Sequence, residues 1–176
     1  VFSTGTEYSY LKIAEGCDKH CTYCIIPYLR GSYRSVPMPE LIAQAEYLAD
    51  TGVKELIVVA QESTLYGTDI YGHNALPELL NNISKVEGIE WIRLLYAYPE
   101  DITDELIDIM ASNPKICHYI DMPIQHASEN ILRRMGRKTN QKELEEKINM
   151  IRSRIPDIAI RTTLITGFPG ETDEDH

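Results

Sequence analysis

Three closely spaced cysteines constrain this chain more than any other feature of its sequence. Cys17, Cys21 and Cys24 follow the spacing C-x3-C-x2-C. Thiolates hold iron–sulfur clusters, and three of them on a four-iron cluster would leave one iron open to another molecule. The cysteines come directly after a strand-like run, residues 8–14. We therefore expect a cluster-binding loop at the carboxyl end of a first strand.

Two other interpretations of these cysteines stay open. A structural zinc site takes four ligands, usually in pairs such as C-x2-C and H-x3-5-H. His20 lies close by, but the fourth cysteine, Cys117, is far along the chain. A disulfide is disfavoured because three clustered cysteines leave one unpaired, and the free thiols favour the reducing cytoplasm as the location. Cys117 stands in an apolar stretch and is expected to be a small buried side chain.

Composition sets the size of the core and argues against some partners. The chain has 176 residues, 43% of them hydrophobic, which predicts one domain with a substantial core. No apolar run approaches the roughly 20 residues that a membrane span needs, so we expect no membrane partner. The formal charge of −10 argues against broad binding to a nucleic-acid backbone. Local basic patches are compatible with that charge.

Strand and helix patterns alternate along the chain. The expected strands are residues 8–15, 54–60, 89–96, 118–122 and 159–166, and the expected helices are residues 37–51, 75–85, 103–112, 129–135 and 141–154. The continuous apolar run of residues 54–60 predicts a strand buried on both faces. Residues 16–36 are expected to form one long loop. Strands that alternate with helices in this way pair in parallel through right-handed crossovers, which predicts an α/β fold.

Polar segments stand where the expected strands end. They are residues 17–24, 60–64, 96–99, 123–126, and 161–163 with 167–171. In barrels of parallel strands the reactive groups lie at the carboxyl ends of the strands. We therefore expect these segments to share one rim.

The cysteine spacing, with an aromatic residue directly before the last cysteine (Tyr23-Cys24), resembles the radical S-adenosylmethionine (radical SAM) superfamily. From about residue 8 onward the chain resembles its methylthiotransferase branch, and within that branch the enzymes that modify an aspartate of small-subunit ribosomal protein twelve. The motifs that carry this resemblance are Gly16-Cys17, Cys24-Ile25-Ile26-Pro27, Arg30-Gly31, A-Q-E-S-T at 60–64, L-L-Y-A-Y-P at 94–99 and D-M-P-I-Q-H at 121–126.

A sister branch that methylthiolates an adenosine in tRNA is the alternative. For that branch we would expect asparagine-rich residues after Gln61 and a Ser-Ser-His-Pro-like end to the third strand. This chain has Glu62-Ser63-Thr64 and Tyr96-Ala97-Tyr98-Pro99 instead. Nucleic acid is an expected partner only if this alternative holds.

The resemblance implies a partial TIM-like barrel. The family's core is an open (β/α)6 barrel, and five parallel strands are expected here. Residues 1–176 would then be a truncated radical SAM core, with residues 1–7 as a lead-in, residues 171–176 as the first turn of a helix, and N-terminal and C-terminal domains outside the chain. An inactive barrel fragment and a zinc-binding module are further alternatives. The fifth strand is expected at an unpaired sheet edge, where the chain would self-associate.

The resemblance also implies the chemistry. Cys17, Cys21 and Cys24 would bind a [4Fe–4S] cluster, and SAM would bind its open iron. Reductive cleavage of SAM would produce a 5′-deoxyadenosyl radical that takes hydrogen from the β-carbon of the substrate aspartate. An electron donor such as flavodoxin would reduce the cluster. A second [4Fe–4S] cluster, in a domain outside this chain, would supply the sulfur.

Four polar residues at the rim are expected to hold SAM. Gln61 would orient its amino group, Gln125 and Ser128 would bond the ribose hydroxyls, and Arg161 would meet the carboxylate, for which a planar guanidinium is suited. For Gln125 and Ser128 the alternative is a capping loop that satisfies its own backbone.

Two further groups complete the expected site. Tyr23, Gly167 and Phe168 match the family pattern around the adenine, although Thr163 stands where the looser pattern has glycine. His126 and Arg137 are expected to contact substrate. The alternatives are a hydrogen-bonded rim position for His126 and, for Arg137, the charged end of a helix.

Overall fold

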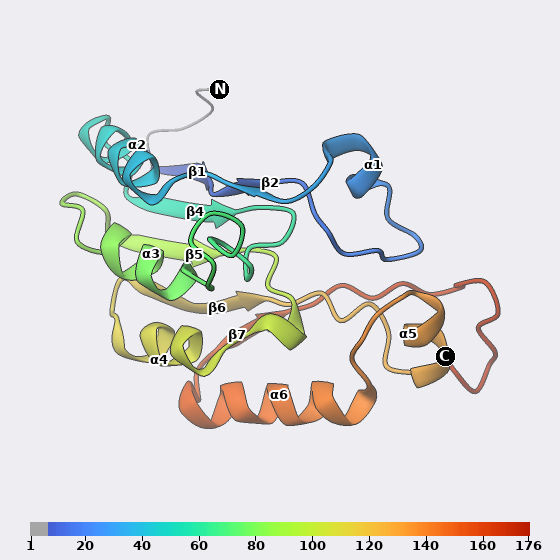
Figure 1. The fold of residues 1–176 in the computed structure, drawn as a ribbon. Helices are drawn as coiled ribbons and strands as arrows, with labels where there is room; N and C mark the ends of the chain where they lie inside the picture. The colour runs from blue at the N-terminus through green and yellow to red at the C-terminus, as the bar shows by residue number, and fades with distance from the viewer. Residues whose placement is uncertain (1–6) are drawn as a thin grey trace.

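The computed structural model describes residues 7–176, and the expected lead-in lies outside this part except for Glu7. Five parallel strands form one sheet in the order β1-β4-β5-β6-β7 (Figure 1). They are β1 (Tyr8–Lys12), β4 (Glu55–Val59), β5 (Trp91–Leu94), β6 (Ile116–Asp121) and β7 (Ala159–Arg161). The predicted α/β fold with five parallel strands is confirmed.

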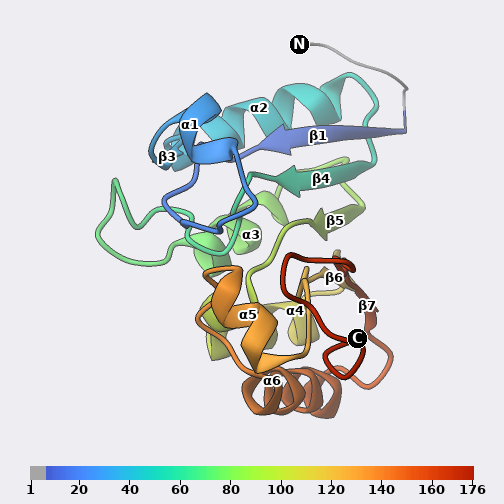
Figure 2. The same ribbon diagram turned by 90° about the vertical axis from the view of Figure 1, so that its right-hand side faces the viewer.

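Four helices connect successive strands and pack on the sheet (Figures 1 and 2). They are α2 (Met38–Asp50), α3 (Leu76–Ile83), α4 (Asp104–Ser112) and α6 (Gln141–Arg154). The predicted bounds of α6 are confirmed, and a capping box between Asn140 and Glu143 explains its start. Thr103 caps α4 as expected, since its side chain accepts a hydrogen bond from the backbone of Leu106. Within residues 7–176, none of the helices has the length and apolar character to cross a membrane.

The sheet buries one face against these helices. Along β4, Leu56 and Val58 are fully buried, whereas Ile57 and Val59 are half-buried. Ile57 pairs in register with Tyr10 and Arg93 on the opposite face. The prediction that residues 54–60 are buried on both faces is therefore wrong. That second face carries polar groups, such as the ion pair between Arg93 and Glu55 (2.5 Å).

The expected first strand is split into two strands, and the expected loop after it contains a helix and a further strand. The strand breaks at Ile13, whose amide donates to Val59 O (3.0 Å) and whose carbonyl accepts from Val36 N (2.9 Å). Beyond Ile13, β2 (Ala14–Glu15) pairs antiparallel with β3 (Arg34–Ser35). The short helix α1 (Ile26–Arg30) lies between β2 and β3. The predicted loop of residues 16–36 is therefore closed at its base by a small two-stranded sheet and contains a short helix.

The last strand is shorter than the predicted 159–166. Regular pairing ends at Arg161 because the Thr162 hydroxyl takes over the next bonds: it donates to Met122 O (2.9 Å) and accepts from Ile124 N (3.2 Å). Contact with the neighbouring segment resumes as a bridge between Gln125 and Leu164. The position of β7 at the edge of the sheet is confirmed.

All five strands point toward one end of the molecule. In Figure 1 the arrowheads face the right-hand side, where the loop before α1, the short helix α5 (Glu129–Arg134) and the C-terminal segment gather. A 3₁₀ turn, η1 (Pro99–Asp101), follows β5 toward the same end. The polar segments at the strand exits therefore share one rim, as the alternation of strands and helices predicts.

The open edge at β7 leads to a first prediction. Parallel edges with free backbone groups recruit another chain, so we expect self-association of this chain at high micromolar concentration. Replacing exposed Ala159 in β7 by lysine should reduce it, because a charge at the edge opposes strand pairing. Light scattering on a size-exclusion column measures the mass.

Ala111→Lys is the matched control, since Ala111 is an exposed alanine on α4. It should leave the association unchanged. A monomeric wild-type chain with β7 amides protected from hydrogen exchange would contradict the prediction.

Candidate functional site

A cavity of about 230 Å³ opens at the carboxyl rim of the sheet. It is lined by residues from the cysteine loop and from the exits of all the following strands: Cys17, Lys19, Cys21, Tyr23, Cys24, Ile26, Gln61, Tyr96, Tyr98, Pro123, Gln125, Arg137 and Thr163. A second cavity, of about 380 Å³ and lined by Lys12 and Val59 among others, shares Ile26, Gln61 and Tyr96 with it. The three cysteines therefore line one cavity at the rim, although they differ in exposure to solvent.

Backbone hydrogen bonds fasten the cysteine loop. Gly16 N donates to Gln61 Oε1 (2.8 Å), and Cys17 N donates to Gly31 O (3.2 Å). On the far side of the loop, Thr22 N donates to Met135 O (3.0 Å). Gly16 has φ +82°, and a side chain there would come within 2.6 Å of the Gly31 carbonyl oxygen, so only glycine fits this turn. The motif Gly16-Cys17 is thus a structural requirement for presenting the first cysteine.

The three sulfur atoms lie in different environments. Cys17 is 8% exposed, its sulfur accepts a hydrogen bond from Lys19 N (3.4 Å), and burial raises the pKa of its thiol. The Cys21 sulfur lies 2.7 Å from the Tyr98 hydroxyl, and Cys24 is exposed. Across residues 7–176, no three His, Cys, Asp or Glu side chains stand ready as a metal-binding group. At least one of the three cysteine side chains, such as that of the exposed Cys24, must therefore turn before all three can share one ligand.

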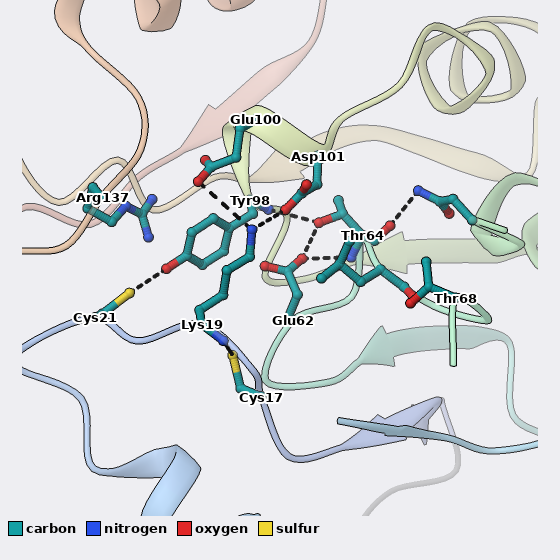
Figure 3. Close-up of polar contacts among 12 residues, drawn as sticks. Cys17, Lys19, Cys21, Glu62, Thr64, Thr68, Tyr98, Glu100, Asp101 and Arg137 are labelled. Carbon is teal, nitrogen blue, oxygen red and sulfur yellow. Dashed lines mark hydrogen bonds and ion pairs between the residues drawn. The ribbon is translucent and has the colours of Figure 1, made fainter. Parts of the chain in front are cut away.

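Two cations flank this cavity. Lys19 Nζ lies 2.5 Å from Asp101 and 3.9 Å from Glu100, both in η1 (Figure 3). Arg137 donates through Nη2 to Pro123 O (2.7 Å), while its buried Nε has no hydrogen-bond partner. Lysine and arginine are almost never buried without such partners. Lys19 thus ties the cysteine loop to η1, and Arg137, which lines the cavity, keeps one buried donor without a partner.

A fully buried carboxylate lies behind the cavity. Glu62 has 0% exposure, and its Oε1 accepts from Thr64 N (2.9 Å) and from the Thr64 hydroxyl (Figure 3). Its Oε2 has no hydrogen-bond partner. Burial raises the pKa of Glu62 to about 7, although the Thr64 side chain and the charge of Lys19 act in the opposite direction. Near neutral pH this carboxyl therefore carries a proton for part of the time.

Two residues at strand exits adopt strained backbone conformations. Tyr96 has φ +58° and Gln125 has φ +71°, values that non-glycine residues rarely adopt. Both line the cavity. Strain of this kind persists where the surrounding structure enforces it and is concentrated at functional sites.

The structure brings only some of the predicted site residues to the cavity. The predicted residues that line it are the three cysteines, Tyr23, Gln61, Gln125 and Arg137. The others lie outside its lining. Ser128 donates its hydroxyl to Asp175, and the Arg161 guanidinium, 56% exposed, lies 3.4 Å from Asp121.

The remaining predicted residues belong to the C-terminal segment or contact it. His126 accepts a hydrogen bond from Ser128 N (2.9 Å) and lies 3.6 Å from Glu171. Phe168 packs edge-on against Tyr23 with ring centroids 6.4 Å apart. Gly167, beside it, has φ +73° and open space around its Cα. These contacts fold residues 167–176 onto the rim.

Sequence reasoning missed four residues of the site, namely Lys19, Glu62, Tyr96 and Tyr98. Glu62, Tyr96 and Tyr98 stand in motifs at strand exits, A-Q-E-S-T and L-L-Y-A-Y-P, which was the available signal. Lys19 stands inside the cysteine spacing, but nothing in that spacing indicates a role for it. Only the fold shows that η1 lies opposite it.

Comparison with known proteins identifies the family. The sequence signature of the Radical SAM superfamily matches residues 11–176, nearly the whole chain. The chain belongs to the radical SAM superfamily. This membership implies a [4Fe–4S] cluster and SAM as cofactors.

Curated relatives match this radical SAM chain over its full length. It is 64% identical over 176 residues to ribosomal protein uS12 methylthiotransferase RimO of Lachnoclostridium phytofermentans, covering 100% of this chain and 40% of the relative. It is 55% identical over 175 residues to the protein of the same name from Clostridium tetani, covering 99% of this chain and 39% of the relative. The chain therefore spans about two fifths of the length of these relatives.

Solved structures of other proteins share the fold. The radical SAM methyltransferase TsrM from Kitasatospora setae superposes with a TM-score of 0.75 at 18% identity, covering 97% of this chain and 32% of that protein. SuiB from Streptococcus suis superposes with a TM-score of 0.67 at 13% identity, covering 97% of this chain and 34% of that protein. At these identities the likeness concerns the fold alone.

The residues of this radical SAM chain fit a cluster with an open iron. Three soft sulfur donors, the ligand type of iron–sulfur clusters, line one cavity. Arg137 also lines this cavity, and its guanidinium is suited to an anionic group. The donor set and its surroundings therefore agree with the cofactors that the family implies.

The buried Glu62 leads to a second prediction. Its pKa rises from an ordinary 4.5 to about 7 on folding, so the folded state holds a proton that the unfolded state releases. Stability from this group is therefore highest below pH 4.5 and is lost as the pH rises toward 7, by about 3 kcal/mol in all. Urea unfolding of the metal-free protein at several pH values should show this loss, and Glu62→Gln should remove it.

Glu146→Gln is the control, since Glu146 is an exposed carboxylate of α6. Its pH dependence should match that of the wild type. Equal slopes for wild type and Glu62→Gln between pH 4.5 and 7 would show that Glu62 is ionised in the folded state.

Proposed function

We propose that this chain is the radical SAM core of a methylthiotransferase that adds a methylthio group to the β-carbon of an aspartate in ribosomal protein uS12. The observation that carries the proposal is that Cys17, Cys21 and Cys24 all line one cavity at the rim of a parallel sheet. Relatives at 64% and 55% identity named as uS12 methylthiotransferases support the ribosomal protein as substrate over the tRNA alternative. Such a substrate would place the enzyme in the cytoplasm.

In this proposal the three cysteines hold one [4Fe–4S] cluster and the rim holds SAM. When bound, the cluster supplies one electron for reductive cleavage of SAM to a carbon-centred radical. The chain's own residues bind and orient the reactants and exclude side reactions, which is the protein's usual share in a cofactor reaction. The interior position of the cavity serves this exclusion.

Gln61 has the clearest orienting role. Its Oε1 accepts the hydrogen bond from Gly16 N (2.8 Å), and this fixes the amide orientation because only the oxygen can accept. The amide NH₂ group then faces the cavity as a donor and suits a carboxylate oxygen. In this proposal the NH₂ group of Gln61 donates to the SAM carboxylate, and the second lone pair of its Oε1 accepts from the SAM ammonium group, the contact that the sequence predicts.

Among the other predicted SAM contacts, those of Ser128 and Arg161 need a rearrangement. Gln125 lines the cavity and is available to the ribose. Ser128 and Arg161 reach the ribose and the carboxylate only by leaving Asp175 and Asp121, to which they are now joined. Tyr23 and Phe168, already in edge-on contact, offer an apolar surface to the adenine. Arg137 and His126 remain the residues proposed to contact the substrate.

The full methylthiotransferase reaction needs more than this core. We propose that a second [4Fe–4S] cluster, carried by a domain of the kind that the longer relatives have room for, supplies the sulfur. A reductant such as flavodoxin delivers the electron. The radical SAM core presented by residues 1–176 supplies the first cluster and the SAM site.

The cysteine assignment gives a third prediction. Changing Cys17, Cys21 or Cys24 to alanine should abolish anaerobic reconstitution of the cluster and all SAM cleavage, because each removes one of three iron ligands. Iron and sulfide analysis with electron paramagnetic resonance measures the cluster. Cys117→Ala is the matched control, since Cys117 lies in β6, outside the cavity lining.

The control should retain the full cluster. A triple variant of Cys17, Cys21 and Cys24 that still assembled a [4Fe–4S] cluster would refute the assignment. One equivalent of zinc in protein purified without iron would favour the zinc-binding module.

The assignment of the sulfur-supplying cluster to another domain gives a fourth prediction. After reconstitution and reduction, this chain alone should cleave SAM slowly to 5′-deoxyadenosine and should leave uS12 without a methylthio group. The reason is that the sulfur donor is assigned to another domain. Mass spectrometry of a uS12 peptide incubated with the chain tests this, and a methylthiolated product would contradict it.

A further inference from the structure

The ring of Tyr98 lies between two cations at the cavity wall. Lys19 Nζ is 4.5 Å from the ring centroid, and Arg137 Cζ is 3.9 Å from it. Figure 3 shows the two side chains on either side of the ring and the Tyr98 hydroxyl directed at the Cys21 sulfur, 2.7 Å away. Cations within about 6 Å of an aromatic centroid are attracted to the ring. The Tyr98 side chain thus contacts two cations through its ring and a proposed cluster ligand, Cys21, through its hydroxyl.

Each part of this arrangement is anchored independently. Lys19 is held by Asp101 (2.5 Å) and Arg137 by Pro123 O (2.7 Å). The backbone of Tyr98 donates to the Thr64 hydroxyl (3.3 Å), at the start of η1. The ring is therefore held in place from the cysteine loop, from the exits of β4 and β5, and from the segment after α5.

The two cations are not equally neutralised. Lys19 pairs with Asp101 and lies 3.9 Å from Glu100, so its charge is largely compensated. The Arg137 guanidinium makes no ion pair with any of the residues 7–176, and its one hydrogen bond there is to the backbone carbonyl of Pro123. Glu100 acts on Arg137 only through its charge and makes no direct contact with it, so this guanidinium is less compensated than the Lys19 ammonium group.

The direction of the hydrogen bond follows from the chemistry of the ligand. Cysteine binds iron as a thiolate, which has no proton to donate. The Tyr98 O–H must then be the donor and the Cys21 sulfur the acceptor. Hydrogen bonds to the sulfur ligands are one of the means by which proteins set the reduction potential of iron–sulfur clusters.

We propose that Tyr98 is a positioning residue that donates a hydrogen bond to the Cys21 sulfur and, held between Lys19 and Arg137, raises the reduction potential of the [4Fe–4S] cluster. This inference rests on the proposed function, because it assumes that Cys21 is a cluster ligand. One-electron reduction by an external reductant adds negative charge to the cluster. A donor at its sulfur and the unpaired charge of Arg137 stabilise the reduced state more than the oxidised state.

The test is the change Tyr98→Phe, which removes the hydroxyl and keeps the ring between the two cations. Wild type and variant are reconstituted anaerobically, and the reduced cluster is titrated potentiometrically by electron paramagnetic resonance. We expect a more negative midpoint potential, with a ratio of reduced to oxidised cluster lower by on the order of threefold to tenfold at a fixed potential. A purely structural role for Tyr98 would lower the amount of cluster and leave its potential unchanged.

Two further variants complete the experiment. Tyr28→Phe removes a hydroxyl from a side chain that is 86% exposed in α1, and its midpoint potential should equal that of the wild type. Arg137→Gln removes the unpaired charge, keeps the Tyr98 hydroxyl, and should also lower the potential. It decides the question if Tyr98→Phe assembles no cluster.

The outcomes separate this inference from the proposed function. If the wild type assembles no cluster, the proposed function fails and the inference fails with it. If clusters form and the potential of Tyr98→Phe equals or exceeds that of the wild type, the inference is overturned while the proposed function stands. If Tyr98→Phe assembles no cluster and Arg137→Gln has the wild-type potential, the inference is likewise overturned.

Discussion

Burial of one face of the parallel sheet under its connecting helices determines the rest of this structure. Leu56, Val58, Ile92 and Leu94 are fully buried on that face, and apolar burial on this scale is the dominant favourable contribution to folding. Because every strand runs in the same direction beneath these helices, every strand exit reaches the same rim. The polar segments need no attraction for one another in order to meet there.

The site that results contains charges where the fold has removed most of the water. Glu62 is fully buried with one oxygen unpartnered, and Lys19 and Arg137 lie at the wall of the same cavity. Groups of this kind cost free energy unless they are paired. Lys19 is paired with Asp101, but Glu62 and Arg137 keep unsatisfied atoms. A site that retains such groups is organised for a ligand or a reaction, since the core alone would be more stable without them.

The sequence predicts the periodic parts of this fold and the positions of the strand exits. Helix α6 and the cap at Thr103 follow from local patterns, and the rim follows from the alternation of strands and helices. What could not be predicted depends on contacts distant in sequence. Thr162 ends β7 through its hydroxyl bonds to the segment after β6, and Ile13 breaks the first strand by bonding to both Val59 and Val36. No local propensity distinguishes these residues from others in a strand.

The same distinction applies to the candidate site. Cys17, Cys21 and Cys24 carry their chemistry in a local spacing, so a sequence suffices to find them. No local sequence pattern predicts that the Tyr98 ring lies between Lys19 and Arg137. That arrangement depends on a contact between the cysteine loop, η1 and the segment after α5. The contacts of Lys19 and Arg137 with the Tyr98 ring couple these segments physically, because a shift of η1 would move both Asp101, the partner of Lys19, and the Tyr98 hydroxyl. The position of the second cysteine therefore depends on residues about eighty positions away in the chain, and substitutions in η1 should affect the cluster before they affect the core.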